Sequence, residues 1–110
     1  MFKSVLATLL IMPVAASAEY RKLNAQEIQR VLGGQELIYE DGTQRFDLSG
    51  QTKSMYDDGT YFGSWGLSGD RYCQKFREAD GWQCYTVLKD AERIRFKGDD
   101  GTYWTGELVD

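Results

Sequence analysis

The chain has 110 residues, a net charge of −4 and no histidine. The acidic balance argues against a nucleic-acid partner, because a negatively charged protein is repelled by the phosphate backbone. The missing imidazole excludes Ser-His-Asp and Cys-His catalytic groups and removes the commonest ligand of zinc and copper sites. No phosphate-binding glycine motif is present, so we expect no cofactor and no metal centre.

The segment MFKSVLATLLIMPVAASA, residues 1–18, has the pattern of a signal peptide. Lys3 supplies a positive start, residues 5–14 form an apolar run, and residues 16–18 read as an A-x-A cleavage site. The run is shorter than the roughly 20 residues that span a bilayer, so cleavage is favoured over an uncleaved anchor. We expect a periplasmic or secreted protein, with residues 19–110 as a single domain and no stable membrane anchor after cleavage.

The first predicted element of this domain is a short helix within LNAQEIQRVLGG, residues 23–34. Asn24 is a good N-cap, and Glu27 three residues later completes a capping box. The apolar face of the helix contains Ala25, Ile28, Val31 and Leu32. Gly33-Gly34 is predicted to supply a left-handed stop. A helix of about nine residues is not stable alone, so its apolar face must dock on the sheet that follows.

The rest of the chain consists of strand-like runs separated by turn signals. The eight runs are ELIYE, QRFDLS, TKSMYD, TYFGSWGL, RYCQKF, WQCYTVLK, RIRFK and TYWTGELV. Asp-Gly at 41–42, 58–59 and 100–101 predicts tight hairpin turns, because both central residues must tolerate positive φ. Within QRFDLS, Phe46 and Leu48 are expected on one face. The predicted fold class is mainly β: a short N-terminal helix followed by an antiparallel meander of about eight strands, as a small barrel or a strongly curled sheet.

The phrase Asp-Gly-Thr occurs at 41–43, 58–60 and 100–102. The unequal spacing argues against a solenoid. YFGSW matches the Tyr-x-Gly-x-Trp pattern of MORN repeats, but the copy at Tyr103 lacks the glycine and the tryptophan at the matching positions. Recurring hairpin turns are therefore the favoured interpretation.

Both cysteines lie in DRYCQKFREADGWQC, residues 70–84. Two lone cysteines usually pair in an oxidising compartment, and the spacing is not the C-x-x-C of a redox motif. If the two flanking runs form one hairpin, the register that opposes Cys73 to Cys84 also opposes Tyr72 to Tyr85. The tyrosines then share one face and the cysteines the other. We predict a Cys73–Cys84 disulfide that contributes about 3 kcal/mol.

Carboxylates are the remaining reactive groups. Asp57-Asp58 and Asp99-Asp100 lie at hairpin turns, where aspartate before glycine is typical, and their spacing does not match the D-x-D-x-D-G calcium loop. Glycoside hydrolysis needs two acids at a separation that only the fold decides. No catalytic residue can be named from the sequence, and an enzyme is the less favoured interpretation.

Several aromatic residues lie near the predicted turns. They are Tyr56, Tyr61, Trp65, Trp82, Tyr103 and Trp104. Filling the core is the favoured role for aromatic residues in a small β-domain, and we expect it for Phe62 and Trp65. Trp82, Tyr103 and Trp104 flank turns and are the candidate partner-contact residues.

The order of these motifs resembles one group of proteins. LNAQEIQRVLGG, DGT, GSWGLSGDRYCQKF, GWQCYTVLKD and IRFKGDDGT follow one another over nearly all of residues 19–110. In this respect the chain is similar to small exported bacterial proteins of the domain-of-unknown-function family 995. The resemblance implies export, pairing of Cys73 with Cys84 and a bacterial envelope setting. It implies no catalytic role.

Two functions are consistent with these patterns. The first is a non-catalytic binding or accessory module that recognises a protein, a peptide or a small ligand through its sheet or barrel mouth. The alternative is a small carboxylate-dependent enzyme that acts on an envelope glycan. Two acids converging in a deep cleft would favour the enzyme, whereas a flat aromatic face or a filled barrel would favour the module.

Overall fold

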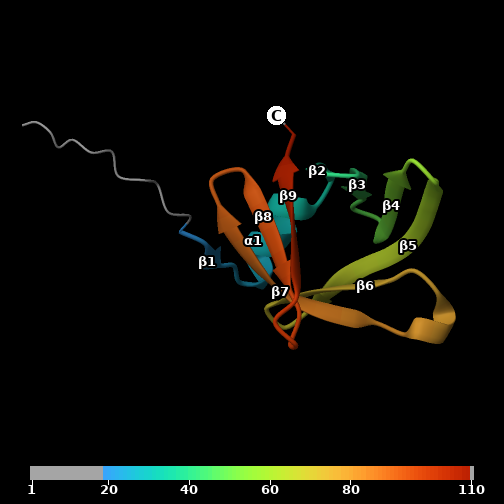
Figure 1. Cartoon of the computed structure of the whole chain (residues 1–110). Helices are drawn as coiled ribbons and strands as arrows, with labels where there is room; N and C mark the ends of the chain where they lie inside the picture. Colours follow the sequence, from blue (N-terminus) through green and yellow to red (C-terminus); the bar gives the residue numbers. More distant parts are fainter. Residues whose placement is uncertain (1–18, 110) are drawn as a thin grey trace, which may run out of the picture.

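The computed structural model describes residues 19–109, so the predicted signal peptide at 1–18 lies outside the described residues. Most of the described chain is β-structure (Figure 1). The elements in chain order are β1 (Arg21–Lys22), α1 (Ala25–Leu32), β2 (Gln35–Tyr39), β3 (Gly42–Phe46), β4 (Gln51–Tyr56), β5 (Gly59–Ser68), β6 (Arg71–Lys75), the 3-10 turn η2 (Glu78–Asp80), β7 (Gln83–Asp90), β8 (Arg93–Lys97) and β9 (Tyr103–Leu108).

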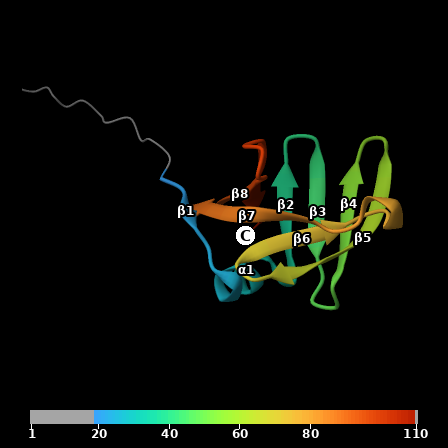
Figure 2. The same cartoon turned by 90° about the horizontal axis from the view of Figure 1, so that it is seen from below.

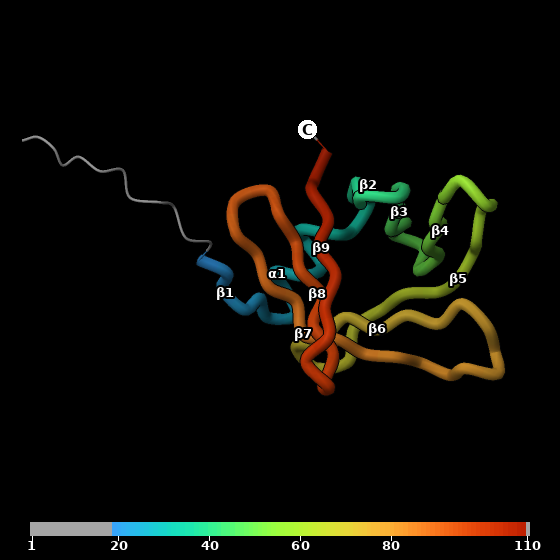
Figure 3. Tube along the Cα trace, viewed as in Figure 1, coloured from blue at the N-terminus to red at the C-terminus, as the bar shows by residue number. Residues whose placement is uncertain are grey.

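Strands β2 to β9 form a closed antiparallel barrel in which neighbours in sequence are neighbours in the sheet. Figure 2 shows β2 to β5 side by side, and the ring is completed by the pairing of β9 with β2. The predicted mainly β antiparallel meander is confirmed, and it is closed. The helix is not the first element, because β1 precedes it and pairs with the end of β7 (Figure 3).

The seam between β2 and β9 is short. It consists of the pairs Leu37–Leu108 and Ile38–Glu107, whereas β3 and β2 pair over their full length. Tyr39 reaches the open part of the seam, where a side chain on Gly106 would collide with the Tyr39 ring. The barrel is therefore sealed at one end of the seam and open at the other.

Helix α1 closes the sealed end of the barrel. The Asn24 side chain accepts a hydrogen bond from the Glu27 N–H, and the Glu27 carboxylate accepts one from the Asn24 N–H, so the capping box is confirmed. Ile28 and Leu32 are fully buried, and α1 packs on β2, β5 and β6. The backbone N–H of Ala25 also donates to a carboxylate oxygen of Asp70, at 2.8 Å in the β5–β6 turn.

The predicted left-handed stop of the helix is correct at one glycine. Gly34 has φ 75°, the left-handed region that glycine adopts without strain. Gly33 has φ −59° and is not left-handed. The helix ends at Leu32, and the left-handed Gly34 two residues later turns the chain into β2.

Four aromatic rings fill the middle of the barrel. Phe46 contacts Trp65 and Tyr72 edge-to-face, with both centroid distances at 5.8 Å, and Tyr72 lies 4.9 Å from Phe96. Trp65 is buried, as expected. Phe62 is 55% exposed, so its predicted core position is wrong. Residues three apart on a strand point to opposite faces, and β5 turns Trp65 inward and Phe62 outward.

Leu48 is also outside the core, contrary to the prediction that it shares a face with Phe46. It is 76% exposed. Strand β3 ends at Phe46, and the chain turns before the alternation reaches Leu48. The inward–outward alternation of β3 therefore does not apply to Leu48, which lies beyond the end of the strand.

The first two Asp-Gly signals locate the β2–β3 and β4–β5 hairpins, but the turns lie one residue earlier than predicted. Tyr39 pairs with Gly42 and Tyr56 pairs with Gly59, so the two-residue loops are Glu40-Asp41 and Asp57-Asp58. A side chain on Gly42 would collide with the backbone oxygen of Met55 in β4. This glycine is needed for close strand approach rather than for positive φ.

The predicted register of the β6–β7 hairpin is confirmed. Cys73 pairs with Cys84 and Tyr72 with Tyr85. The cysteines form a disulfide with their Cα atoms 4.0 Å apart. Tyr72 points into the core, and the disulfide lies on the outer face of the barrel.

In residues 19–109, no helix is long and apolar enough to cross a membrane.

Candidate functional site

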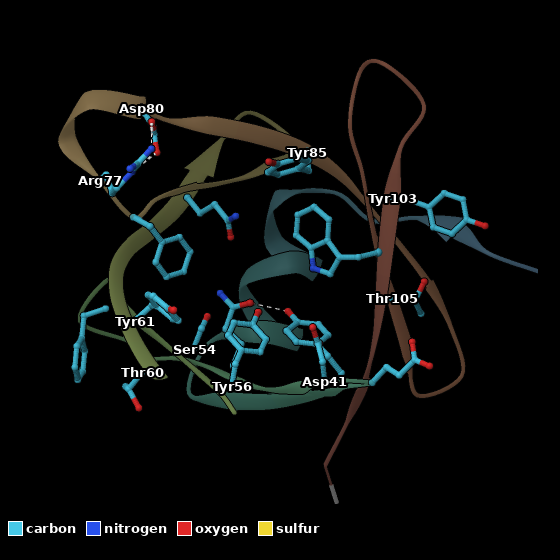
Figure 4. A pocket seen from close by; sticks show the side chains of 17 residues that line it. Asp41, Ser54, Tyr56, Thr60, Tyr61, Arg77, Asp80, Tyr85, Tyr103 and Thr105 are labelled. Atoms are coloured by element: carbon cyan, nitrogen blue, oxygen red, sulfur yellow. Dashed lines mark hydrogen bonds and ion pairs between the residues drawn. The ribbon is translucent and has the colours of Figure 1, made fainter. Parts of the chain in front are cut away.

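The barrel end opposite α1 is open and hollow. A cavity of about 1110 Å³ lies there, slightly larger than the usual range for small-molecule pockets (Figure 4). Its aromatic lining includes Tyr39, Tyr56, Tyr61, Phe76, Tyr85 and Trp104. We call this cavity with its lining residues the mouth.

Strand alternation explains why these side chains meet. On β6, Tyr72 and Gln74 point inward at successive even positions, and Phe76 continues the series beyond the end of the strand. Tyr72 is fully buried in the core, while Gln74 and Phe76 line the mouth. On β4, Ser54 and Tyr56 line the mouth in the same way. Each strand thus runs from an apolar core to a polar and aromatic opening.

Hydrogen-bonded side chains form the floor of the mouth. The Tyr39 hydroxyl donates to Gln44 Oε1 at 2.6 Å, and Gln44 Nε2 donates to Thr52 Oγ1 at 2.8 Å and to the Tyr72 hydroxyl at 3.3 Å. The Tyr72 hydroxyl donates to Gln74 Oε1 at 2.6 Å. Burial raises the pKa of Tyr39 and of Tyr72 well above the usual value for tyrosine. Both phenols are therefore neutral hydrogen-bonding groups.

One wall of the mouth is an aromatic stack. Trp104 stacks on Phe96 at 5.0 Å and meets the Tyr85 ring edge-on at 4.7 Å. Tyr56 and Tyr61 lie 6.2 Å apart on another part of the lining. Burial raises the pKa of Tyr56 and, together with the charge of Asp100, that of Tyr85. The wall offers flat apolar faces with neutral hydroxyl groups.

The rim of the mouth is acidic. The charged lining residues are Glu40, Asp41, Arg77 and Asp80. Arg77 donates two hydrogen bonds to Asp80, at 2.9 and 3.1 Å, and the Arg77 side chain lowers the pKa of that carboxyl. A smaller hollow beside the mouth adds Asp57 and Asp58. The positive charge at the rim is thus paired, while other carboxylates remain exposed to water.

Asp41 and Asp80, on the rim of the mouth, do not face each other as a pair of acids. Asp80 lies in the β6–β7 connection and Asp41 in the β2–β3 turn, on opposite sides of the mouth (Figure 4). Asp80 is held by Arg77, which favours its ionised form and opposes a general-acid role. Among residues 19–109, no group of three or more histidine, cysteine, aspartate or glutamate side chains is placed to hold a metal ion.

The structure divides the three candidate partner-contact residues. Trp104 points into the mouth, whereas the ring of Tyr103, at the rim and 57% exposed, points away from the cavity and lies 4.1 Å from Arg95 Cζ (Figure 4). Trp82 is 51% exposed but lies on the outer face, where Lys75 Nζ is 5.2 Å from its ring. Trp82 therefore has no part in the mouth.

Sequence reasoning missed the polar members of the site. Gln44 and Gln74 lie at inward positions next to inward aromatic residues of the same strand, and Ser54 lies between inward Thr52 and Tyr56. Polar residues on the core face of a strand were the available signal, because buried polar groups need partners. Their meeting point could not be read from the sequence, since it depends on barrel closure.

The fold and the site define a small antiparallel β-barrel with one helix-closed end and one open aromatic mouth. No protein-family model, curated protein or solved structure matches the chain. The resemblance to family 995 therefore stays a prediction based on the order of the motifs.

Proposed function

We propose that the protein is an exported, non-catalytic binding module that holds one small molecule in its mouth. The observation that carries the proposal is the open cavity of about 1110 Å³ above a hydrogen-bonded floor. Barrels of eight strands have room for one small ligand when side chains do not fill them. A mostly apolar lining with a few convergent polar groups is typical of ligand sites.

The separation of the acids supports binding over catalysis. An enzyme acting on a glycan needs one carboxylic acid with a raised pKa and a second carboxylate at a set distance. In the mouth, Arg77 lowers the pKa of Asp80, and Asp41 lies across the opening. Asp41 and Asp80 therefore do not provide such a pair, whereas the cavity offers shape and hydrogen-bonding groups.

Export is the second part of the proposal. It is supported by the signal pattern of residues 1–18 and by the Cys73–Cys84 disulfide, since disulfides persist in oxidising compartments. The resemblance to family 995 implies a bacterial envelope setting. Intact-mass analysis of the exported protein should give Glu19 as its first residue. Retention of residues 1–18 would contradict export with cleavage after Ala18.

Ligand binding can be tested with the chain's own tryptophans. Trp65 is in the core, Trp82 on the outer face and Trp104 in the mouth. We expect millimolar N-benzylacetamide to change the tryptophan fluorescence saturably in the Trp82→Phe variant. The change should disappear in the matched Trp104→Phe variant, because the reporting ring is gone.

Two further probes, benzylamine and phenylacetate, share the ring of N-benzylacetamide and differ only in their polar group. Benzylamine extends the search to cationic ligands and phenylacetate to anionic ones. If none of the three gives a saturable change, or if the change survives Trp104→Phe, the mouth is not a small-molecule site.

A further inference from the structure

We infer that Gln74 is a fixed hydrogen-bond donor in the mouth, and that the ligand carries a neutral amide carbonyl on a flat ring. This inference rests on the proposed function and names the chemistry of the ligand. It follows from the direction of the hydrogen bonds in the floor, the aromatic walls and the acidic rim.

The direction of the floor is set by a backbone carbonyl. The Thr52 hydroxyl donates to the Arg45 carbonyl oxygen at 2.7 Å, and a carbonyl can only accept. With its single proton used, the Thr52 oxygen must accept from its other neighbour, Gln44, at 2.8 Å. Only the NH₂ end of the Gln44 amide can donate, so its orientation is fixed.

The fixed amide of Gln44 in turn orients both buried tyrosines. Its oxygen accepts from the Tyr39 hydroxyl at 2.6 Å, and its second N–H donates to the Tyr72 oxygen at 3.3 Å. Tyr72 therefore has its own proton free to donate, and it donates to Gln74 Oε1 at 2.6 Å. Gln74 is therefore the last residue in this series of hydrogen bonds.

The consequence is that Gln74 presents its NH₂ group to the cavity. Its oxygen is occupied by Tyr72, and in the described part of the chain no acceptor is hydrogen-bonded to its Nε2. Gln74 lines the mouth. The mouth is open, so water can accept from this Nε2 while the cavity is empty. A molecule that displaces the water must bring its own acceptor, because a donor covered without a partner is costly. A carbonyl oxygen meets this need.

The walls and the rim specify the rest of the ligand. Phe76, Tyr85 and Trp104 line the same cavity as Gln74 and favour a flat ring by stacking. At the rim, Arg77 is neutralised by Asp80, while Glu40 and Asp41 add negative charge. An anionic ligand would be repelled, so the acceptor on the ring must be neutral. An aromatic amide has this chemistry; an acetamido sugar shares the neutral amide, but its ring is a chair that presents one apolar face.

The test exchanges the donor for an acceptor without disturbing the floor. Gln74→Glu retains an oxygen for the Tyr72 hydroxyl and replaces the NH₂ group by a second, charged oxygen. Affinities are measured by fluorescence at pH 8 in the Trp82→Phe background, with N-benzylacetamide and benzylamine. We expect Gln74→Glu to weaken N-benzylacetamide roughly tenfold, the effect of leaving a polar partner unpaired, and to strengthen benzylamine.

Two further variants serve as controls. Gln74→Met fills a similar volume without either polar group, and it should weaken N-benzylacetamide without strengthening benzylamine. Gln51→Glu makes the same change at an exposed position of β4, and it should leave both affinities unchanged. If Gln74→Glu does not fold, the loss in Gln74→Met relative to Gln51→Glu still decides whether the donor matters.

The outcomes separate this inference from the proposed function. If N-benzylacetamide binds in the mouth with the same affinity in all three variants, the role of Gln74 is wrong and the binding module stands. If no probe binds the protein before any substitution at Gln74, the proposed function itself fails. N-acetylglucosamine measured against glucose distinguishes a sugar from an aromatic amide, since the acetamido group should strengthen binding only in a mouth that accepts a sugar ring.

Discussion

The two ends of the barrel are built from the same strands but have opposite chemistry. At the closed end, Leu23, Ile28 and Leu32 are fully buried against the sheet. At the mouth, Trp104 and Gln74 remain partly accessible around a cavity. If the proposed function holds, stability depends mainly on the closed end and ligand recognition on the mouth. A substitution should therefore affect one property much more than the other.

The largest effect is expected at the closed end. Leu32→Ala removes a fully buried side chain from α1 and leaves a cavity, which costs about 2–5 kcal/mol of unfolding free energy. Denaturant unfolding measures this loss. Leu48→Ala is the matched control, because Leu48 is exposed and its truncation should change stability by no more than about 0.5 kcal/mol. Equal costs at the two positions would contradict a helix-closed core.

The disulfide should stabilise the fold without affecting the affinity of the mouth for a ligand. Replacing both Cys73 and Cys84 by serine should lower the free energy of unfolding by about 3 kcal/mol, mainly by freeing the unfolded chain. Thermal unfolding measures this cost, and N-benzylacetamide titration below the melting temperature should give an unchanged affinity. A loss of binding in the folded variant would show that the β6–β7 hairpin shapes the mouth through its disulfide.

The smallest effect is the pH dependence of stability. The Asn24 backbone N–H and then Arg21 lower the pKa of Glu27 from its usual 4.5, and Arg77 lowers that of Asp80 from 3.8. A carboxyl with a lowered pKa in the folded state stabilises the protein fully above its unfolded pKa. That contribution is lost as the pH falls through the folded pKa. Stability should therefore be level near neutral pH and fall below about pH 4.5.

Glu27→Gln isolates the helix-cap part of this effect. Glutamine retains an oxygen for the Asn24 N–H but does not titrate, so the fall in unfolding free energy below pH 4.5 should be shallower. Urea unfolding between pH 3 and 7 compares the two proteins. Identical slopes would mean that Glu27 has no part in the acid sensitivity.

Local patterns in the sequence predicted the features that depend on few neighbouring residues. The Asn24–Glu27 capping box needs only three residues of spacing, and the opposition of Cys73 to Cys84 needs only one hairpin. Both are confirmed. Closure of the barrel by Leu37 and Leu108 depends on pairing between distant parts of the chain, which no local pattern encodes.

The residues of the mouth were predicted only in part, for the same reason. Trp82 and Trp104 have similar settings in the sequence, each beside a predicted turn. Only the closed ring turns Trp104 inward beside Tyr85 and leaves Trp82 on the outer face beside Lys75. Likewise, Gln74 becomes a donor in a cavity only when β3 and β4 bring their own polar side chains to the floor.

The most direct test of the division between the two ends is to map where a ligand acts. Backbone amide shifts across residues 19–109 can be followed by NMR during titration with N-benzylacetamide. We predict saturable shifts in the inward-facing ends of β4, β6 and β9 around the mouth, with the amides of α1 unchanged. Shifts centred on α1, or on the outer face around Trp82, would contradict the assignment of recognition to the mouth.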